Sequence, residues 1–176
     1  MGFSALLAAG MTFSFIGDLS MAGFLPWRHN LIGGMLSFGI AHVCYLASFA
    51  GIAGTKGIAI MNSALIAGAV LLVVTQTWIW RTILRVPTHP QAVVNGAFAY
   101  GLLVGSTAVA AAGLWQATAG HWWLPLAGGL LFVLSDFFIG WSDIGGRRMN
   151  NPHLWIWVTY GLAQACIVYS PLIHDL

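Results

Sequence analysis

Two of the four acidic side chains of this chain lie inside segments that are otherwise apolar enough to cross a membrane. Asp18 follows the run MTFSFIG and Asp136 follows the run LPLAGGLLFVLS, and the chain contains no glutamate. A carboxylate in hydrocarbon costs at least ~2.5–3.5 kcal/mol on insertion scales, so intramembrane acids usually face a bundle interior and often carry function. Two such carboxyls can divide the roles of proton donor and charge stabiliser. We therefore take Asp18 and Asp136 as candidate catalytic residues.

The composition indicates an integral membrane protein. Of the 176 residues, 59% are hydrophobic, 6% are charged and nine are tryptophan. Soluble domains carry roughly 25% charged residues, which excludes an ordinary soluble globule. The formal net charge of +2 is too small to indicate nucleic-acid binding. Cys44 and Cys166 lie in apolar runs, which is typical of packing residues rather than of a disulfide or metal framework.

Charged and turn residues divide the chain into six apolar segments, each near the ~20 residues that a membrane-crossing helix needs. Runs of this length rule out barrel strands, and in lipid the backbone must satisfy its own hydrogen bonds, so we expect helices. The predicted spans are about 2–24, 31–53, 58–80, 91–115, 122–141 and 153–172. The sequence therefore predicts an all-α, polytopic transmembrane helix bundle in which residues 1–176 form a single integral membrane domain.

The basic residues of the loops predict the orientation of this bundle. The odd-numbered loops contain Arg28, Arg81, Arg85, Arg147 and Arg148, whereas the even-numbered loops contain only Lys56. Cytoplasmic loops carry an excess of Lys and Arg. The odd-numbered loops are therefore predicted to be cytoplasmic, with both termini on the outer side.

Several other polar side chains share the predicted depth of the two aspartates. Each aspartate lies about six residues before a cytoplasmic loop, which places both in the cytoplasmic half of the membrane at ~1.5 Å per residue. The further candidates, expected to bind or orient a substrate, are His42, Tyr45, Asn95, Tyr100, Ser135, Tyr160 and Gln164. A polar cavity that opens toward the cytoplasm would explain why residues of several helices agree in depth.

Each of these residues also has an explanation that involves no chemistry. Tyr45, Tyr100 and Ser135 could bond a neighbouring backbone, as polar residues of membrane helices usually do. His42 could be an interhelical donor, and the two aspartates could be neutral and bonded across helices. One histidine with two aspartates is too sparse to indicate a metal site, so we expect no metal and no other cofactor.

Four segments of the chain resemble the signatures of one family. They are Phe15-Ile16-Gly17-Asp18, Ala41-His42-Val43-Cys44-Tyr45, the stretch GLLFVLSD that ends at Asp136, and the stretch TYGLAQ that ends at Gln164. Together, in this order, they resemble the YhhN family, which includes the animal lysoplasmalogenases. Two features depart from that family. Its members generally have seven or eight spans, and a basic or amide residue commonly follows Ser135-Asp136, where this chain has Phe137-Phe138.

The resemblance implies a hydrolase of the vinyl ether bond of lysoplasmalogens. That reaction needs a proton on the alkenyl carbon and then water attack on an oxocarbenium ion, much as in glycoside cleavage by two carboxyl groups. Two carboxyls in a low-dielectric pocket repel each other as anions, so one is expected to hold its proton while the other is ionised. The sequence does not assign which of Asp18 and Asp136 is the acid.

Two classes of function therefore follow from the sequence. The first is a membrane-embedded lipid hydrolase that takes a lysophospholipid substrate and contacts membrane lipids; we expect it in a prokaryotic cell membrane. The second is a lipid or small-solute carrier, or a proton-coupled transporter, that uses the same aspartate pair. No internal repeat and no interrupted pair of helices, as found in many transporters, is visible in the sequence.

Overall fold

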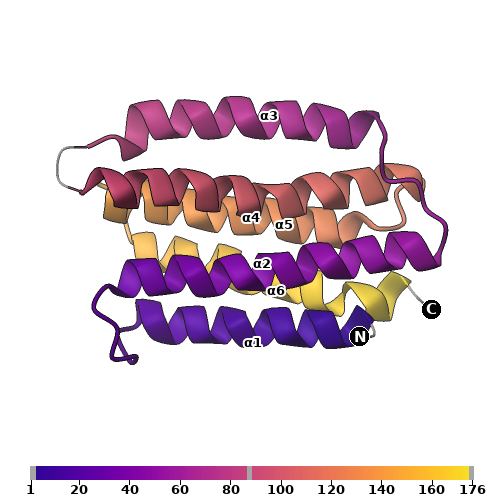
Figure 1. Cartoon of the computed structure of the whole chain (residues 1–176), viewed down its shortest axis with the longest axis horizontal. Helices are drawn as coiled ribbons and strands as arrows, with labels where there is room; N and C mark the ends of the chain where they lie inside the picture. Colours follow the sequence, from indigo (N-terminus) through magenta and orange to yellow (C-terminus); the bar gives the residue numbers. More distant parts are fainter. Residues whose placement is uncertain (1–2, 87–88, 175–176) are drawn as a thin grey trace. The chain divides into compact units, whose positions relative to one another are not determined.

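The computed structural model describes residues 3–86 and 89–174, and these residues form helices and no strand. Figure 1 shows the helices along the chain. Their bounds are α1 Phe3–Met21, α2 Asn30–Thr55, α3 Ser63–Ile79, α4 Gln91–Ala117, α5 Trp123–Ile139 and α6 Pro152–His174. Two π-helical turns, η1 Trp80–Leu84 and η2 Gly140–Ile144, continue α3 and α5. The all-α prediction is confirmed.

Five of the helical segments are long and apolar enough to cross a membrane: 4–21, 30–55, 63–84, 91–117 and 123–144. α6 has a spanning length of 23 residues but is not one of these five. In the described part of the chain, one helix thus lies in each of the six predicted segments. Together they have the architecture of a multi-pass membrane protein.

The chain divides into two compact units, Met1–Ile58 and Ala59–Leu176. The first unit is an antiparallel hairpin of α1 and α2. Its helices approach closely at glycines, because a Cβ on Gly10 would clash with the Tyr45 ring and one on Gly17 would lie 2.8 Å from the Phe38 ring. Small residues at such contacts are typical of helix packing in membranes, and here they seat two aromatic side chains of α2 against α1.

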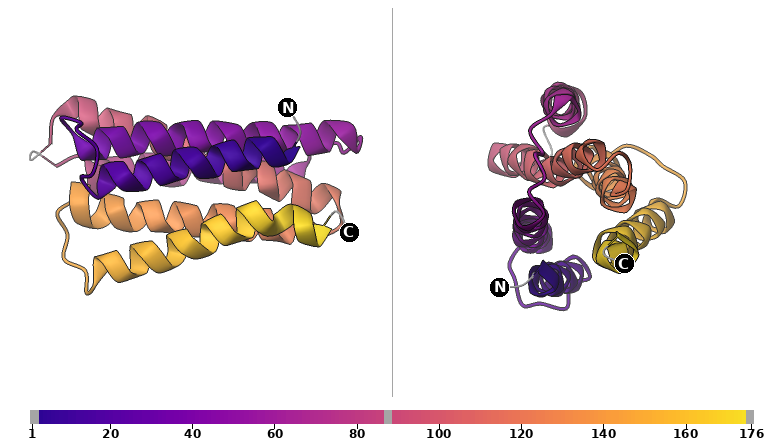
Figure 2. Two further views of the ribbon diagram at one scale, coloured as in Figure 1. Left: turned by 90° about the horizontal axis from the view of Figure 1, so that it is seen from below. Right: turned by 90° about the vertical axis from the view of Figure 1, so that its right-hand side faces the viewer.

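In the second unit, helices that are neighbours in sequence pack against each other, α3 on α4, α4 on α5 and α5 on α6. The end-on view of Figure 2 shows α3 at the edge of this unit, beside α4. α5 lies between two partners at Gly128 and Gly129: a Cβ on Gly129 would meet the Ala108 backbone of α4 at 2.7 Å, and one on Gly128 the Ala163 carbonyl of α6 at 2.9 Å. This close approach packs α4, α5 and α6 together, and these three helices carry the polar residues described below.

The structure differs from the prediction at the ends of α3. The helix begins at Ser63 rather than near residue 58, because Asn62 caps it: the Asn62 side chain accepts a hydrogen bond from the Leu65 backbone and donates one to the Gly113 carbonyl of α4. An N-cap asparagine satisfies an otherwise unpaired backbone donor and so fixes the start of a helix. At the other end α3 continues through η1 to Leu84. The π-helical turns have no counterpart in the sequence pattern, which predicts only uninterrupted helix.

Candidate functional site

In the second unit, the sequence-predicted residues of three helices meet around Asp136. The Tyr100 hydroxyl of α4 and the Asp136 carboxyl of α5 form a side-chain hydrogen bond, and Tyr160 of α6 is close enough to interact electrostatically with Tyr100. Gln164 donates a hydrogen bond to the Tyr160 hydroxyl at 3.2 Å. We call Tyr100, Asp136, Tyr160 and Gln164 the Asp136 cluster.

The carboxyl group of Asp136 is buried but not saturated with hydrogen bonds. Its Oδ2 atom is inaccessible to solvent and has no hydrogen-bond partner among the residues that the structure describes. Buried polar groups in proteins nearly always have a hydrogen-bond partner, so an exception in a native fold often marks a functional group. An oxygen that is kept dry and free of protein partners can exchange a proton with a bound substrate or water.

Aromatic and small polar contacts hold the cluster in place. The Tyr160 ring packs edge-on against Phe132 with centroids 5.4 Å apart, and Trp157 contacts Tyr160 at 5.9 Å. Ser135, buried next to Asp136, donates a hydrogen bond to the Ile156 carbonyl at 3.1 Å and so ties α5 to α6. Ser135 therefore positions the helix rather than facing the cluster.

The first unit holds two further predicted residues, His42 and Tyr45, in a more tightly closed group. His42 and Tyr45 of α2 and Ser14 of α1 are each fully buried. The Ser14 and Tyr45 hydroxyl oxygens share a hydrogen bond of 3.4 Å, and the His42 ring meets the Tyr45 ring edge-on at 5.7 Å. Asp18 lies one helical turn after Ser14 and is half-buried. We call Ser14, His42 and Tyr45 the His42 cluster.

Asp18 and Asp136 belong to different units, so their pairing remains a prediction. The predicted site residue Asn95 does not belong to either cluster. It is exposed on α4 and accepts a hydrogen bond from Gln91 at 2.8 Å. A surface pair one helical turn apart explains Asn95 without a ligand.

Sequence reasoning missed two residues that reach toward this part of α4 from α3. Gln76 is buried and donates a hydrogen bond to the Phe98 carbonyl at 3.3 Å, in the space that the absence of a side chain at Gly101 leaves open. The Trp80 ring packs on Phe98 at 5.7 Å, and its Nε1 is buried without a hydrogen-bond partner in the described part of the chain. A glutamine within an apolar span was a signal that pointed to Gln76. Trp80 looked like an ordinary interfacial tryptophan.

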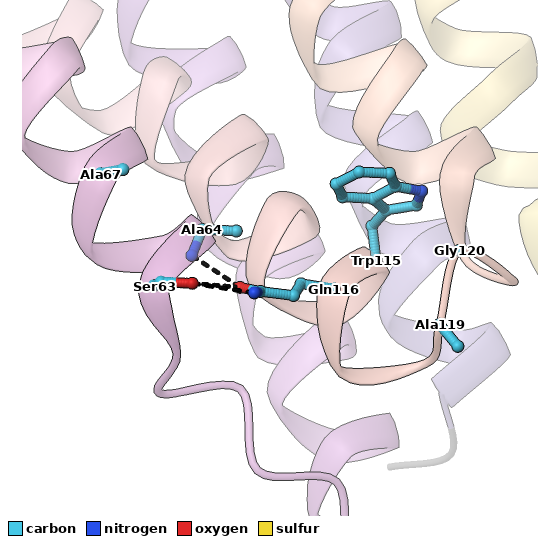
Figure 3. A pocket seen from close by; sticks show the side chains of 7 residues that line it. All are labelled: Ser63, Ala64, Ala67, Trp115, Gln116, Ala119 and Gly120. Carbon is cyan, nitrogen blue, oxygen red and sulfur yellow. Dashed lines mark hydrogen bonds between the residues drawn. The ribbon is translucent and has the colours of Figure 1, made fainter.

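A pocket of about 520 Å³ lies at the opposite end of α4, where the start of α3 meets the end of α4. Figure 3 shows that Gln116 bridges to α3 there, accepting hydrogen bonds from the Ala64 backbone and the Ser63 hydroxyl. Trp115 forms another part of the wall. The lining has no ionisable side chain, and Gln116 is ~24 Å from Tyr100 along the helix at ~1.5 Å per residue. This pocket is therefore separate from the Asp136 cluster and has no acid or base.

The comparison with known families agrees with the four sequence segments, two of which supply Asp136, Tyr160 and Gln164. The model of the YhhN family matches residues 1–171, which is nearly the whole chain. The chain belongs to the YhhN family. No curated protein and no solved structure matches this YhhN chain. Within its described residues no group of three or more His, Cys, Asp or Glu side chains could hold a metal ion.

Proposed function

We propose that this YhhN protein is a membrane-embedded hydrolase that cleaves the vinyl ether bond of lysoplasmalogens. The observation that carries the proposal is the Asp136 carboxyl, which is buried in an apolar helix cluster, bonded to Tyr100, and has an oxygen without a protein partner. The family resemblance supplies the substrate class, since YhhN proteins include lysoplasmalogenases.

The chemistry requires few groups. A carboxylic acid transfers its proton to the outer alkenyl carbon, which leaves an oxocarbenium ion on the carbon bonded to oxygen. Water adds to that carbon and returns a proton to the carboxylate, and the resulting hemiacetal breaks into a fatty aldehyde and a glycerophospho-base. One carboxyl can donate the proton while a second carboxylate steadies the cation, as in glycoside hydrolysis. We assign these two roles to Asp136 and Asp18 without specifying which residue is the acid.

The other members of the Asp136 cluster have supporting roles in this proposal. The Tyr100 hydroxyl fixes the orientation of the Asp136 carboxyl, while Tyr160 and Gln164 offer a hydroxyl and an amide that can hold the attacking water. A dry, preorganised set of dipoles of this kind stabilises developing charge more strongly than water does.

A panel of three lysophospholipids tests the proposal. They carry the same head group and a 1-alkenyl, 1-alkyl or 1-acyl chain, and each is incubated with the purified protein. Aldehyde should be released from the alkenyl lipid only. Fatty acid released from the acyl lipid would indicate an esterase instead. No product from any of the three, together with proton-coupled lipid flux in vesicles, would favour the carrier.

A further inference from the structure

The two π-helical turns of the second unit carry the same pairing of a tryptophan with an arginine. η1 and η2 contact each other. The Arg85 guanidinium lies over the Trp80 ring, 5.1 Å from its centroid, and the Arg147 guanidinium lies over the Trp141 ring at 4.7 Å. We call Arg85 and Arg147 the arginine rim. π-helical turns are rare in proteins, and those that occur often lie at functional sites.

The rim is held in place before any ligand binds. Arg147 Nη2 donates a hydrogen bond of 2.8 Å to the Thr82 carbonyl, which joins the segment after η2 to η1. Stacking on the indoles limits the rotamers of both guanidinium groups, while both arginines stay exposed to solvent. A guanidinium has five N–H donors in a fixed fork, so most of the donors of Arg147 remain available.

The charge at the rim is not neutralised by the protein. Asp143, the acid of the η2 turn, accepts a hydrogen bond from the Ser142 hydroxyl at 2.7 Å. Neither rim arginine forms an ion pair with it within the described residues. Two exposed, stacked guanidinium groups without a carboxylate partner are suited to an anion, and the planar fork of each guanidinium matches the oxygens of a phosphate.

The indoles under the rim pack on phenylalanines that are close in sequence to members of the Asp136 cluster. The Trp141 ring packs on Phe137, which follows Asp136, at 5.7 Å. The Trp80 ring packs on Phe98, two residues before Tyr100. From Asp136 to the end of η2 the rise is ~12 Å at ~1.5 Å per residue, and the arginine side chains turn back over the indoles along this path.

We infer that Arg85 and Arg147 bind the phosphodiester of the lysophospholipid whose chain enters the Asp136 cluster. The inference rests on the proposed function for the identity of that lipid. The rim fixes the charged end of the substrate near the predicted cytoplasmic surface, while the reacting end lies deeper among the helices. The arginine rim therefore gives the protein a preference for phospholipids over neutral ether lipids.

Binding of two ligands that are not cleaved tests the inference independently of turnover. They are a 1-alkyl lysophosphatidylethanolamine and the matching 1-alkylglycerol, which lacks the phosphate. The double variant Arg85→Gln/Arg147→Gln should weaken binding of the phospholipid about 10-fold or more, since hydrogen bonds to charged groups are strong. Binding of the alkylglycerol should stay within about twofold, because the variant removes no contact to the chain.

The matched control is Arg81→Gln/Arg148→Gln. It removes the same charge from the same two loops, and both arginines are exposed and unstacked in the described part of the chain. The control should leave the affinity for both ligands unchanged. An equal loss in both double variants would show a diffuse charge effect and overturn the inference, as would an equal loss for both ligands in the rim variant.

Two further arms complete the test. If the double rim variant does not fold, Arg147→Lys takes its place, because it keeps the charge and loses the planar fork. It should weaken phospholipid binding, and parental binding would contradict the inference. Inorganic phosphate that displaces the lysophospholipid at concentrations near the lipid's own Kd would assign the rim to free phosphate and overturn the lipid assignment. Failure of the proposed function is seen separately, as the absence of aldehyde from the alkenyl lipid.

Discussion

The His42 cluster and the Asp136 cluster both place polar side chains inside apolar helices, but only the Asp136 cluster contains a carboxyl group. Ser14, His42 and Tyr45 are fully enclosed, and Tyr45 is packed into the space left by Gly10. Asp136 instead keeps an oxygen without a protein partner. A bonded hydroxyl pair such as Ser14 and Tyr45 stabilises and orients two helices, whereas a carboxyl oxygen without a protein partner is available to a ligand. For this reason we place the proposed chemistry at Asp136, in the second unit.

The largest effect is expected from Asp136→Asn. Asparagine keeps the shape of the side chain and a hydrogen bond to Tyr100. It cannot donate the acid proton or carry the negative charge of a carboxylate. General acid–base catalysis contributes typically 10²–10⁴-fold, so aldehyde release should fall by about that factor or more. The thermal midpoint in detergent, measured beside the rate, should stay close to the parent. A parental rate would remove the basis for placing the chemistry at Asp136.

Asp18→Asn tests whether the first unit takes part in the reaction at all. If Asp18 supplies the second carboxyl, the rate of aldehyde release should fall by a similar ~10²–10⁴-fold. A rate near that of the parent would break the pair and leave the second unit to act with a single carboxyl.

Tyr100→Phe and Tyr45→Phe form a matched pair across the two clusters. Tyr100 bonds the reacting carboxyl, and hydrogen bonds to charged groups are worth about 1.5–3 kcal/mol, so the turnover of Tyr100→Phe should fall roughly 10–100-fold. The Tyr45 hydroxyl shares a 3.4 Å hydrogen bond with Ser14, which has no role in the proposed reaction, so its loss should leave the rate nearly unchanged. If Tyr45→Phe reduced turnover more than Tyr100→Phe, the assignment of roles to the clusters would be reversed.

The smallest effect is expected from Gly10→Ala, which should act on stability. The new methyl group would clash with the Tyr45 ring, and overpacking of this kind costs typically about 1–3 kcal/mol. Gly51→Ala in the same hairpin is the control, because nothing lies within 4 Å of the Cβ it would add. Thermal unfolding should show a lower midpoint for Gly10→Ala only. Equal midpoints would mean that Tyr45 is not held as tightly as its packing indicates.

Much of this architecture could be predicted from the sequence, because in lipid the backbone must form helices and apolar length alone sets their number. The predicted depth of Tyr100, Asp136, Tyr160 and Gln164 also agrees with their meeting in one cluster. Depth does not give the direction in which a side chain points around its helix, and for that reason Asn95 was included although it faces outward. The π-helical turns and the stacked arginines depend on how α3 and α5 end against each other, which hydropathy does not encode.

The most direct test of the central claim follows the proton itself. The parent protein is given 1-alkenyl lysophosphatidylethanolamine in D₂O, and the aldehyde is trapped at once as a hydrazone for mass spectrometry. Protonation of the alkenyl carbon by a carboxylic acid predicts one deuterium on the carbon next to the carbonyl, and loss of this product in Asp136→Asn. Aldehyde without that deuterium, or labelled aldehyde formed equally fast by Asp136→Asn, would contradict the account.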